Sequence, residues 1–81
     1  MYLLDSEKKE IIQFNRVFVA RTYGKKGYSY ALTAILYKAG ADMTTLGYYA
    51  TEQQAQAELI KIYNALAAGE HVYAVSSQPA G

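Results

Sequence analysis

Several residue types that build active sites are scarce or missing from this chain. It has no cysteine and no tryptophan, one proline and one histidine among 81 residues. The lack of cysteine excludes disulfide bonds, thiolate metal sites and thiol nucleophiles, and it fits a reducing compartment. A hydrolytic triad needs a nucleophile, a base and an orienting group, and His71 is the only imidazole. Glu70 and His71 have no third ligand at a zinc-like spacing. We therefore expect no catalytic residues, no cofactor and no metal, and a protein that is not an enzyme.

The chain also lacks an excess of charge of either sign and any long hydrophobic run. Eight Lys and Arg stand against seven Asp and Glu, so the net charge is +1. A DNA mimic is usually strongly acidic and a non-specific nucleic-acid binder strongly basic. No apolar run approaches the length of a membrane-spanning helix, and the first residues show no signal-peptide pattern. We expect a cytoplasmic protein without a membrane partner.

The clearest pattern that is present predicts an amphipathic helix from Glu52 to Ala68. Thr51 is a good N-cap, and Gln54 completes a capping box with it. Gly69 is suited to the left-handed position that ends a helix. The predicted apolar stripe consists of Ala55, Leu59, Ile62 and Leu66, widened by Ile60, Tyr63 and Ala67. The side chains expected to face water are those of Glu52, Gln53, Gln56, Glu58, Lys61 and Asn64.

Strand patterns surround this helix, separated by turn residues. The expected segments are Met1–Leu4 as a short edge strand or arm, an apolar run at Ile11–Phe14, and strands at Arg16–Tyr23, Tyr28–Lys38, Met43–Tyr49 and His71–Val75. The order β-β-β-β-α-β predicts an α+β fold, in which an antiparallel meander of four to five strands packs on one helix. We expect residues 1–75 to form a single domain and residues 76–81 a flexible C-terminal tail.

The strand predicted over Tyr28–Lys38 is apolar in both of its phases. A sheet with one solvated face should instead alternate between apolar and polar residues. Because one helix covers one face, we expect something to cover part of the other. The candidates are the N-terminal segment, curvature of the sheet towards a barrel, a second copy of the chain, and a different partner.

The chain contains nine tyrosines, which is a marked excess. Tyrosine has an apolar ring and a polar tip, so it suits half-buried strand positions and protein interfaces. The candidate protein-interface residues are Tyr28, Tyr30, Tyr37 and Tyr48. The other interpretation is a small β-rich domain that uses tyrosine on its strands.

Positive charge gathers at Arg21, Lys25 and Lys26 around the first predicted hairpin. These are the candidate nucleic-acid contacts, with Tyr23 and Tyr28 beside them for base stacking. Arg16 and Lys38 would extend this surface along the sheet. The alternative interpretation is a solvated hairpin tip, where lysines keep a sheet edge soluble.

The stretch Leu46-Gly47-x-Tyr49-x-Thr51-x-Gln53-Gln54-Ala55 resembles the sheet end and helix start of two DNA-binding families. They are the ethylene-response-factor domains of plants and the arm-type domains of phage and transposon integrases, in which a three-stranded antiparallel sheet packs on one helix and enters the major groove. The resemblance implies a sheet-plus-helix fold. The strands here carry Tyr, Thr, Ala and Leu where those families carry Arg, Lys and Trp, which weighs against DNA binding.

The overall layout resembles a loose group of small uncharacterised proteins of Gram-positive bacteria and their phages. The shared segments are the entry at Leu46–Thr51, the helix pattern at Ala55–Leu66 and the run Gly69–Tyr73. The resemblance implies an accessory role in a phage or mobile element, binding and modulating a host or phage protein, such as a component of a defence system. We expect a non-catalytic protein-interaction module with a protein partner, or a homodimer; the alternative is a nucleic-acid-binding domain.

Overall fold

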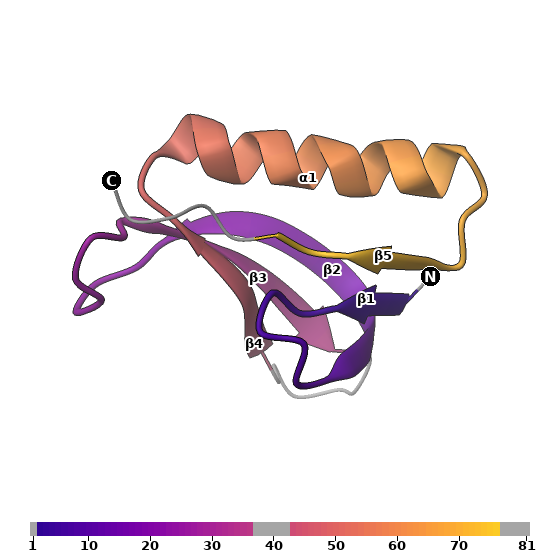
Figure 1. The fold of residues 1–81 in the computed structure, drawn as a ribbon, viewed down its shortest axis with the longest axis horizontal. Coiled ribbons are helices and arrows are strands. Elements are labelled where there is room, and N and C mark those ends of the chain that lie inside the picture. Colours follow the sequence, from indigo (N-terminus) through magenta and orange to yellow (C-terminus); the bar gives the residue numbers. More distant parts are fainter. Residues whose placement is uncertain (1, 37–42, 77–81) are drawn as a thin grey trace.

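The computed structural model describes residues 2–36 and 43–76, and these form one sheet and one helix. The elements are β1 (Tyr2–Leu4), β2 (Ile11–Arg21), β3 (Tyr30–Leu36), β4 (Met43–Tyr49), α1 (Glu52–Ala67) and β5 (Val72–Ala74). The five-stranded sheet has the order β4-β3-β2-β1-β5, and α1 packs on it (Figure 1). The described strands from β1 to β4 pair antiparallel, and β5 pairs parallel with β1. The predicted α+β fold with one helix on a meander is confirmed.

The second strand is longer than the sequence pattern indicated. Ile11–Phe14 and Arg16–Tyr23 were expected as separate segments, but β2 runs without a break from Ile11 to Arg21. The ladder to β3 pairs Phe14 with Leu36 and Arg16 with Ile35, so Asn15 is an extra residue in a β-bulge. A bulge lets a strand bend without ending. The polar Asn15 therefore bends β2 and does not end it.

Two bulges determine which side chains face the helix. Phe14 before the bulge and Val17 after it both pack against the core, although their spacing would place them on opposite faces of a regular strand. In β4, Leu46 is the extra residue between the Thr45 and Gly47 pairings. Leu46 and Tyr49 can therefore both be buried in the core. The buried core residues are Leu3, Ile12, Leu32, Ala34, Leu46, Tyr49, Ala55, Ile62 and Val75.

The sheet curls, which brings its two ends together (Figure 1). The Ser6 backbone N–H, just after β1, donates to the Leu46 carbonyl oxygen of β4 at 2.9 Å. The Tyr49 hydroxyl, at the end of β4, donates to the Ser76 carbonyl oxygen at 2.5 Å. Curvature of the sheet was one of the four features expected to cover the second face of the strand predicted over Tyr28–Lys38. The curved sheet encloses the side chains that face the helix, whereas Phe18 and Ile35 on the outer face are half-buried.

The start of α1 matches its prediction closely. The Thr51 hydroxyl accepts from the Gln54 N–H at 3.2 Å, and the Gln54 side chain accepts from the Thr51 N–H at 3.3 Å. The helix ends at Ala67, one residue earlier than expected, and Gly69 has a φ of +78°. Within the described residues, α1 is too short and too polar to cross a membrane.

Candidate functional site

The two sides of α1 are used differently. The buried helix residues are Ala55, Glu58, Ile62 and Ala65. The predicted stripe instead contained Leu59 and Leu66, of which the first is half-buried and the second exposed. The helix is therefore rotated about its axis, away from the centre of its apolar stripe and towards Glu58. We call the side that carries Glu58 and Ala65 the β5 flank and the side that carries Leu59, Tyr63 and Leu66 the β2 flank.

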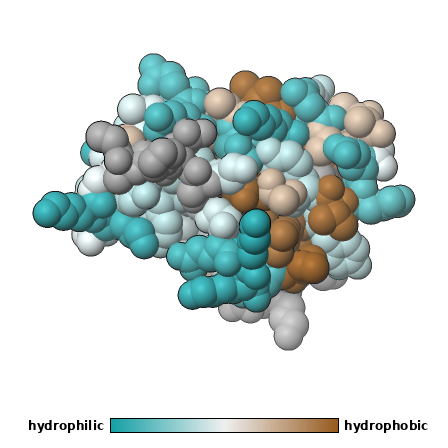
Figure 2. All heavy atoms as spheres, viewed as in Figure 1, coloured by the Kyte–Doolittle hydropathy of each residue, from teal (hydrophilic) through white to brown (hydrophobic). Residues whose placement is uncertain are grey.

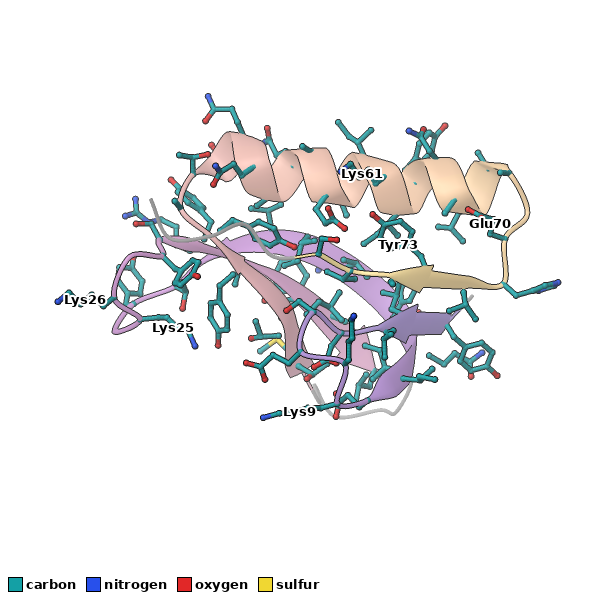
Figure 3. All side chains as sticks on the ribbon, viewed as in Figure 1. Lys9, Lys25, Lys26, Lys61, Glu70 and Tyr73 are labelled. Atoms are coloured by element: carbon teal, nitrogen blue, oxygen red, sulfur yellow. The ribbon has the colours of Figure 1, made fainter. Side chains whose placement is uncertain are left out.

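Glu58 was expected to face water, and this expectation is wrong. Its side chain is 2% exposed. Its Oε2 accepts from the Tyr73 hydroxyl at 2.6 Å and from the Ser76 N–H at 3.0 Å. The segment from β5 to Ser76 returns beneath α1 and supplies these donors; Figure 3 shows Tyr73 between β5 and the helix. A buried carboxylate is tolerated where donors replace the water it has lost.

Two tyrosines near Glu58, Tyr49 and Tyr73, have raised pKa values. Burial raises the pKa of Tyr49 well above its ordinary value, and the nearby Glu58 carboxylate raises it further. Burial likewise raises the pKa of Tyr73, with the hydrogen bond to Glu58 as the second cause. Both phenols are therefore protonated donors at neutral pH. A raised pKa makes a phenol a weaker acid, and the hydrogen bonds of this cluster fasten the segment from β5 to Ser76 to α1.

The β2 flank forms one wall of an apolar surface groove of about 430 Å³. The lining residues are Phe14, Asn15, Arg16 and Val17 of β2 and Leu59, Ile60, Ile62, Tyr63 and Leu66 of α1. Ile60, Tyr63 and Leu66 are 57%, 67% and 46% exposed. Arg16 is the one charged residue of this lining. Sequence reasoning placed the helix side chains in the core stripe and so missed the groove.

A second group of exposed hydrophobic residues lies outside the groove. Figure 2 shows hydrophobic side chains gathered over β1 and β5, in a surface that is otherwise largely hydrophilic. Tyr2 pairs with Val72 across these strands, and Ile11 pairs with Leu4. Tyr2, Ile11 and Val72 are all exposed. None of these three residues lines the groove on the β2 flank.

Of the four tyrosines predicted as a protein interface, Tyr30 and Tyr48 lie on opposite faces of the sheet. The rings of Tyr28 and Tyr48 lie 5.9 Å apart, centroid to centroid. Tyr30 pairs with the buried Tyr49 and packs against the core, so it faces the helix side. Tyr48 pairs with Ala31, one residue along β3, and so lies on the outer face. Tyr37 lies outside the described residues.

The three basic residues predicted to contact nucleic acid are also divided between faces. Lys25 Nζ lies 4.4 Å from the centroid of the Tyr48 ring on the outer face. The Arg21 guanidinium lies 5.4 Å from the Tyr30 ring on the helix side. Lys26 points away from the body of the protein at the hairpin tip (Figure 3). Lys25 also shares a small hollow with Asp5 and Glu7, which lowers the positive potential there. Lys38 lies outside the described residues.

Comparisons with known proteins do not extend this description. No family model, no curated protein and no solved structure matches the chain. In residues 2–36 and 43–76, no three His, Asp or Glu side chains gather in a way that would hold a metal ion. The groove on the β2 flank is therefore the candidate functional site, on its geometry alone.

Proposed function

We propose that the chain is a non-catalytic protein-interaction module that binds a partner protein in the groove on the β2 flank. The observation that carries this proposal is the exposure of Ile60, Tyr63 and Leu66 side by side on one helix flank, above an apolar hollow. Covering apolar surface gains about 25 cal/mol per Å². Exposed apolar patches with a polar surround are typical of binding surfaces.

The polar cluster on the other flank strengthens the proposal. A helix free to turn would bury Leu59 and Leu66 and expose Glu58, as its sequence predicts. The bonds from Tyr73 and Ser76 to Glu58 oppose that rotation. The groove is therefore held open before any partner arrives, and a preformed surface loses less entropy on binding.

The resemblance to small proteins of Gram-positive bacteria and their phages suggests a narrower form of this function. In that form the partner is a host or phage protein whose activity the chain modulates, such as a component of a defence system. The source of this suggestion is the pattern from Leu46 to Tyr73, and the groove supplies a place for such a partner to bind.

A pair of neighbouring helix substitutions tests the function. Tyr63→Glu puts a charge into the groove, and Asn64→Glu puts the same charge on an adjacent exposed residue that does not line it. Immobilised wild-type chain and both variants are incubated with lysate of the source cell, and the captured proteins are identified. We expect a protein that wild type and N64E retain and Y63E loses.

Two results would contradict the proposal. One is a partner retained equally by wild type, N64E and Y63E, which would place the binding surface elsewhere. The other is the absence of any captured protein together with a monomeric wild-type chain by light scattering across a range of concentrations. A wild-type dimer that Y63E dissociates, and N64E does not, would identify a second copy of the chain as the partner.

A further inference from the structure

The strand that lines the groove has an open edge. In the part of the chain that the structure describes, β1 pairs with β2 at Ile11, Ile12 and Gln13. From Phe14 to Arg21, β2 pairs with β3 on its other side. Among the described residues no strand continues the line of β1 beyond Gln13, and Figure 1 shows β2 running on past β1 beneath α1. Within residues 2–36 and 43–76, this part of β2 thus has a strand partner on one side only.

The ladder indicates which residues present backbone groups at this edge. Thr22 N–H donates to the Ser29 carbonyl oxygen at 2.9 Å, so Thr22 turns its backbone polar groups towards the β3 side. In an antiparallel ladder this direction alternates from residue to residue. The pairing between Arg16 and Arg21 is regular, and therefore Val17 and Val19 turn their N–H and C=O groups towards the open edge.

The open edge and the groove meet at Val17. Val17 lines the groove together with Phe14, and its side chain faces α1. A ligand on this edge would have backbone donors and acceptors on one side and the apolar side chains of Tyr63 and Leu66 on the other. Arg16 pairs with Ile35 on the outer face, so its charge lies on the opposite side of the same edge.

We infer that the groove takes an extended segment of its partner, which joins the sheet as a strand beside β2. The alternating side chains of such a strand would place apolar residues in the groove and acidic residues near Arg16. Addition of a strand to an exposed sheet edge is a recurring mode of peptide recognition. This inference rests on the proposed function and adds to it the conformation and the composition of the segment.

Pairing chemistry favours a strand over a helix in this site. A partner helix has its backbone groups bonded internally, so it would cover the edge of β2 and leave the groups of Val17 without partners. Covering a polar group without a replacement bond costs about 1–3 kcal/mol. An extended segment replaces those bonds and also fills the groove.

The experiment uses peptides selected from a random display library on the wild-type chain. Selected sequences are synthesised, and their affinities are measured for wild type, Y63E and N64E. We expect binders with apolar residues at alternate positions and at least one acidic residue, whose affinity falls at least about tenfold with Y63E and stays unchanged with N64E.

Backbone methylation then tests the pairing itself. One series of peptides carries N-methyl groups at odd positions and a second at even positions, with the side chains unchanged. We expect one series to bind about tenfold or more weakly and the other to bind nearly as the parent peptide does. Amide hydrogen exchange at Val17 should slow on binding of the parent peptide.

The outcomes separate this inference from the proposed function. Groove-dependent binders that tolerate both methylation series, or that bind as helices, would overturn the strand while leaving the interaction module intact. Binders that are equally tight for wild type and Y63E, or the lack of any binder, would overturn both. Self-pairing through β2, revealed by a concentration-dependent molar mass and slow exchange at Val17 without peptide, would overturn the choice of a separate partner.

Discussion

The two flanks of α1 invert the usual relation between polarity and burial. On the β5 flank the Glu58 carboxylate is buried and accepts hydrogen bonds from Tyr73 and Ser76. On the β2 flank Ile60, Tyr63 and Leu66 are exposed beside an apolar groove. Both flanks belong to the same 16-residue helix, and they differ in their side chains and in what packs beside them. The hydrogen bonds from Tyr73 and Ser76 to Glu58 hold the helix in its observed rotation. Hydrophobicity alone would have favoured the rotation that buries Leu59 and Leu66.

This comparison suggests a division of labour. The β5 flank stabilises the fold and fixes the angle at which the helix lies. The β2 flank contributes less to stability and is available to a partner. Substitutions on the β5 flank should therefore change the free energy of unfolding, whereas those on the β2 flank should change binding.

The largest effect is expected for Glu58→Ala. The substitution removes the acceptor for Tyr73 and Ser76 and leaves a cavity, so the free energy of unfolding should fall by about 3 kcal/mol. Urea denaturation followed by circular dichroism measures it. Glu58→Gln retains one acceptor oxygen and should lose less than the alanine variant. A loss below about 1 kcal/mol for E58A would show that the cluster does not determine the helix rotation.

The second-largest effect is expected at alkaline pH, which should lower the stability contributed by the β5 flank. Tyr49 and Tyr73 both have raised pKa values in the folded chain. Above about pH 10 the unfolded chain releases phenolic protons that the folded chain retains, so the free energy of unfolding falls as pH rises. The slope approaches ~1.4 kcal/mol per pH unit for each such tyrosine. Urea titrations from pH 8 to 11 measure it, and Tyr73→Phe should reduce the slope. A flat profile for wild type would contradict the assignment.

Tyr49→Phe should have a smaller effect than loss of Glu58. It removes the bond to the Ser76 carbonyl oxygen but keeps the buried ring. We expect a loss of about 1 kcal/mol in the free energy of unfolding. In the same urea experiment, a loss equal to that of Tyr49→Ala would mean that the hydroxyl, and not the ring, carries the contribution of Tyr49.

Substitution on the β2 flank should hardly change stability. Ile60→Gln replaces an exposed branched side chain with a good helix former, and we expect a change within about 0.5 kcal/mol. The same variant should lose affinity for groove-binding peptides. A destabilisation above about 1.5 kcal/mol would show that the groove belongs to the core of the fold and would remove the contrast between the flanks.

The smallest effect is expected at the basic hairpin. Lys25→Gln combined with Lys26→Gln should leave stability and peptide binding unchanged, because Lys26 is exposed and Lys25 lies away from the groove. Fluorescence anisotropy with labelled DNA at low and moderate salt tests the alternative function. Binding that weakens steeply with salt and disappears in this double variant would favour a nucleic-acid-binding domain.

Local signals predicted the fold better than the site. The Thr51 capping box and the turn glycines act within a few residues. These signals predicted the helix and the order of the strands along the chain. The parallel pairing of β5 with β1 joins distant parts of the chain, and no local pattern encodes it. The rotation of α1 has the same origin, because the donors to Glu58 come from Tyr73 and Ser76. The groove depends on that rotation and on the bulge at Asn15, and so the sequence alone did not reveal it.

The bulge at Asn15 also determines how the gene can tolerate changes in length. Removal of the Asn15 codon would delete the extra residue, so Phe14 and Arg16 would become neighbours in a regular ladder and keep their pairings to β3. Removal of one codon between Arg16 and Arg21 would instead turn every side chain on one side of the deletion to the opposite face of the sheet. The loss of one residue from the hairpin at Lys25 and Lys26 would reverse nothing. Natural variation in chain length should accordingly collect at that hairpin and avoid the regular part of β2 from Arg16 to Arg21.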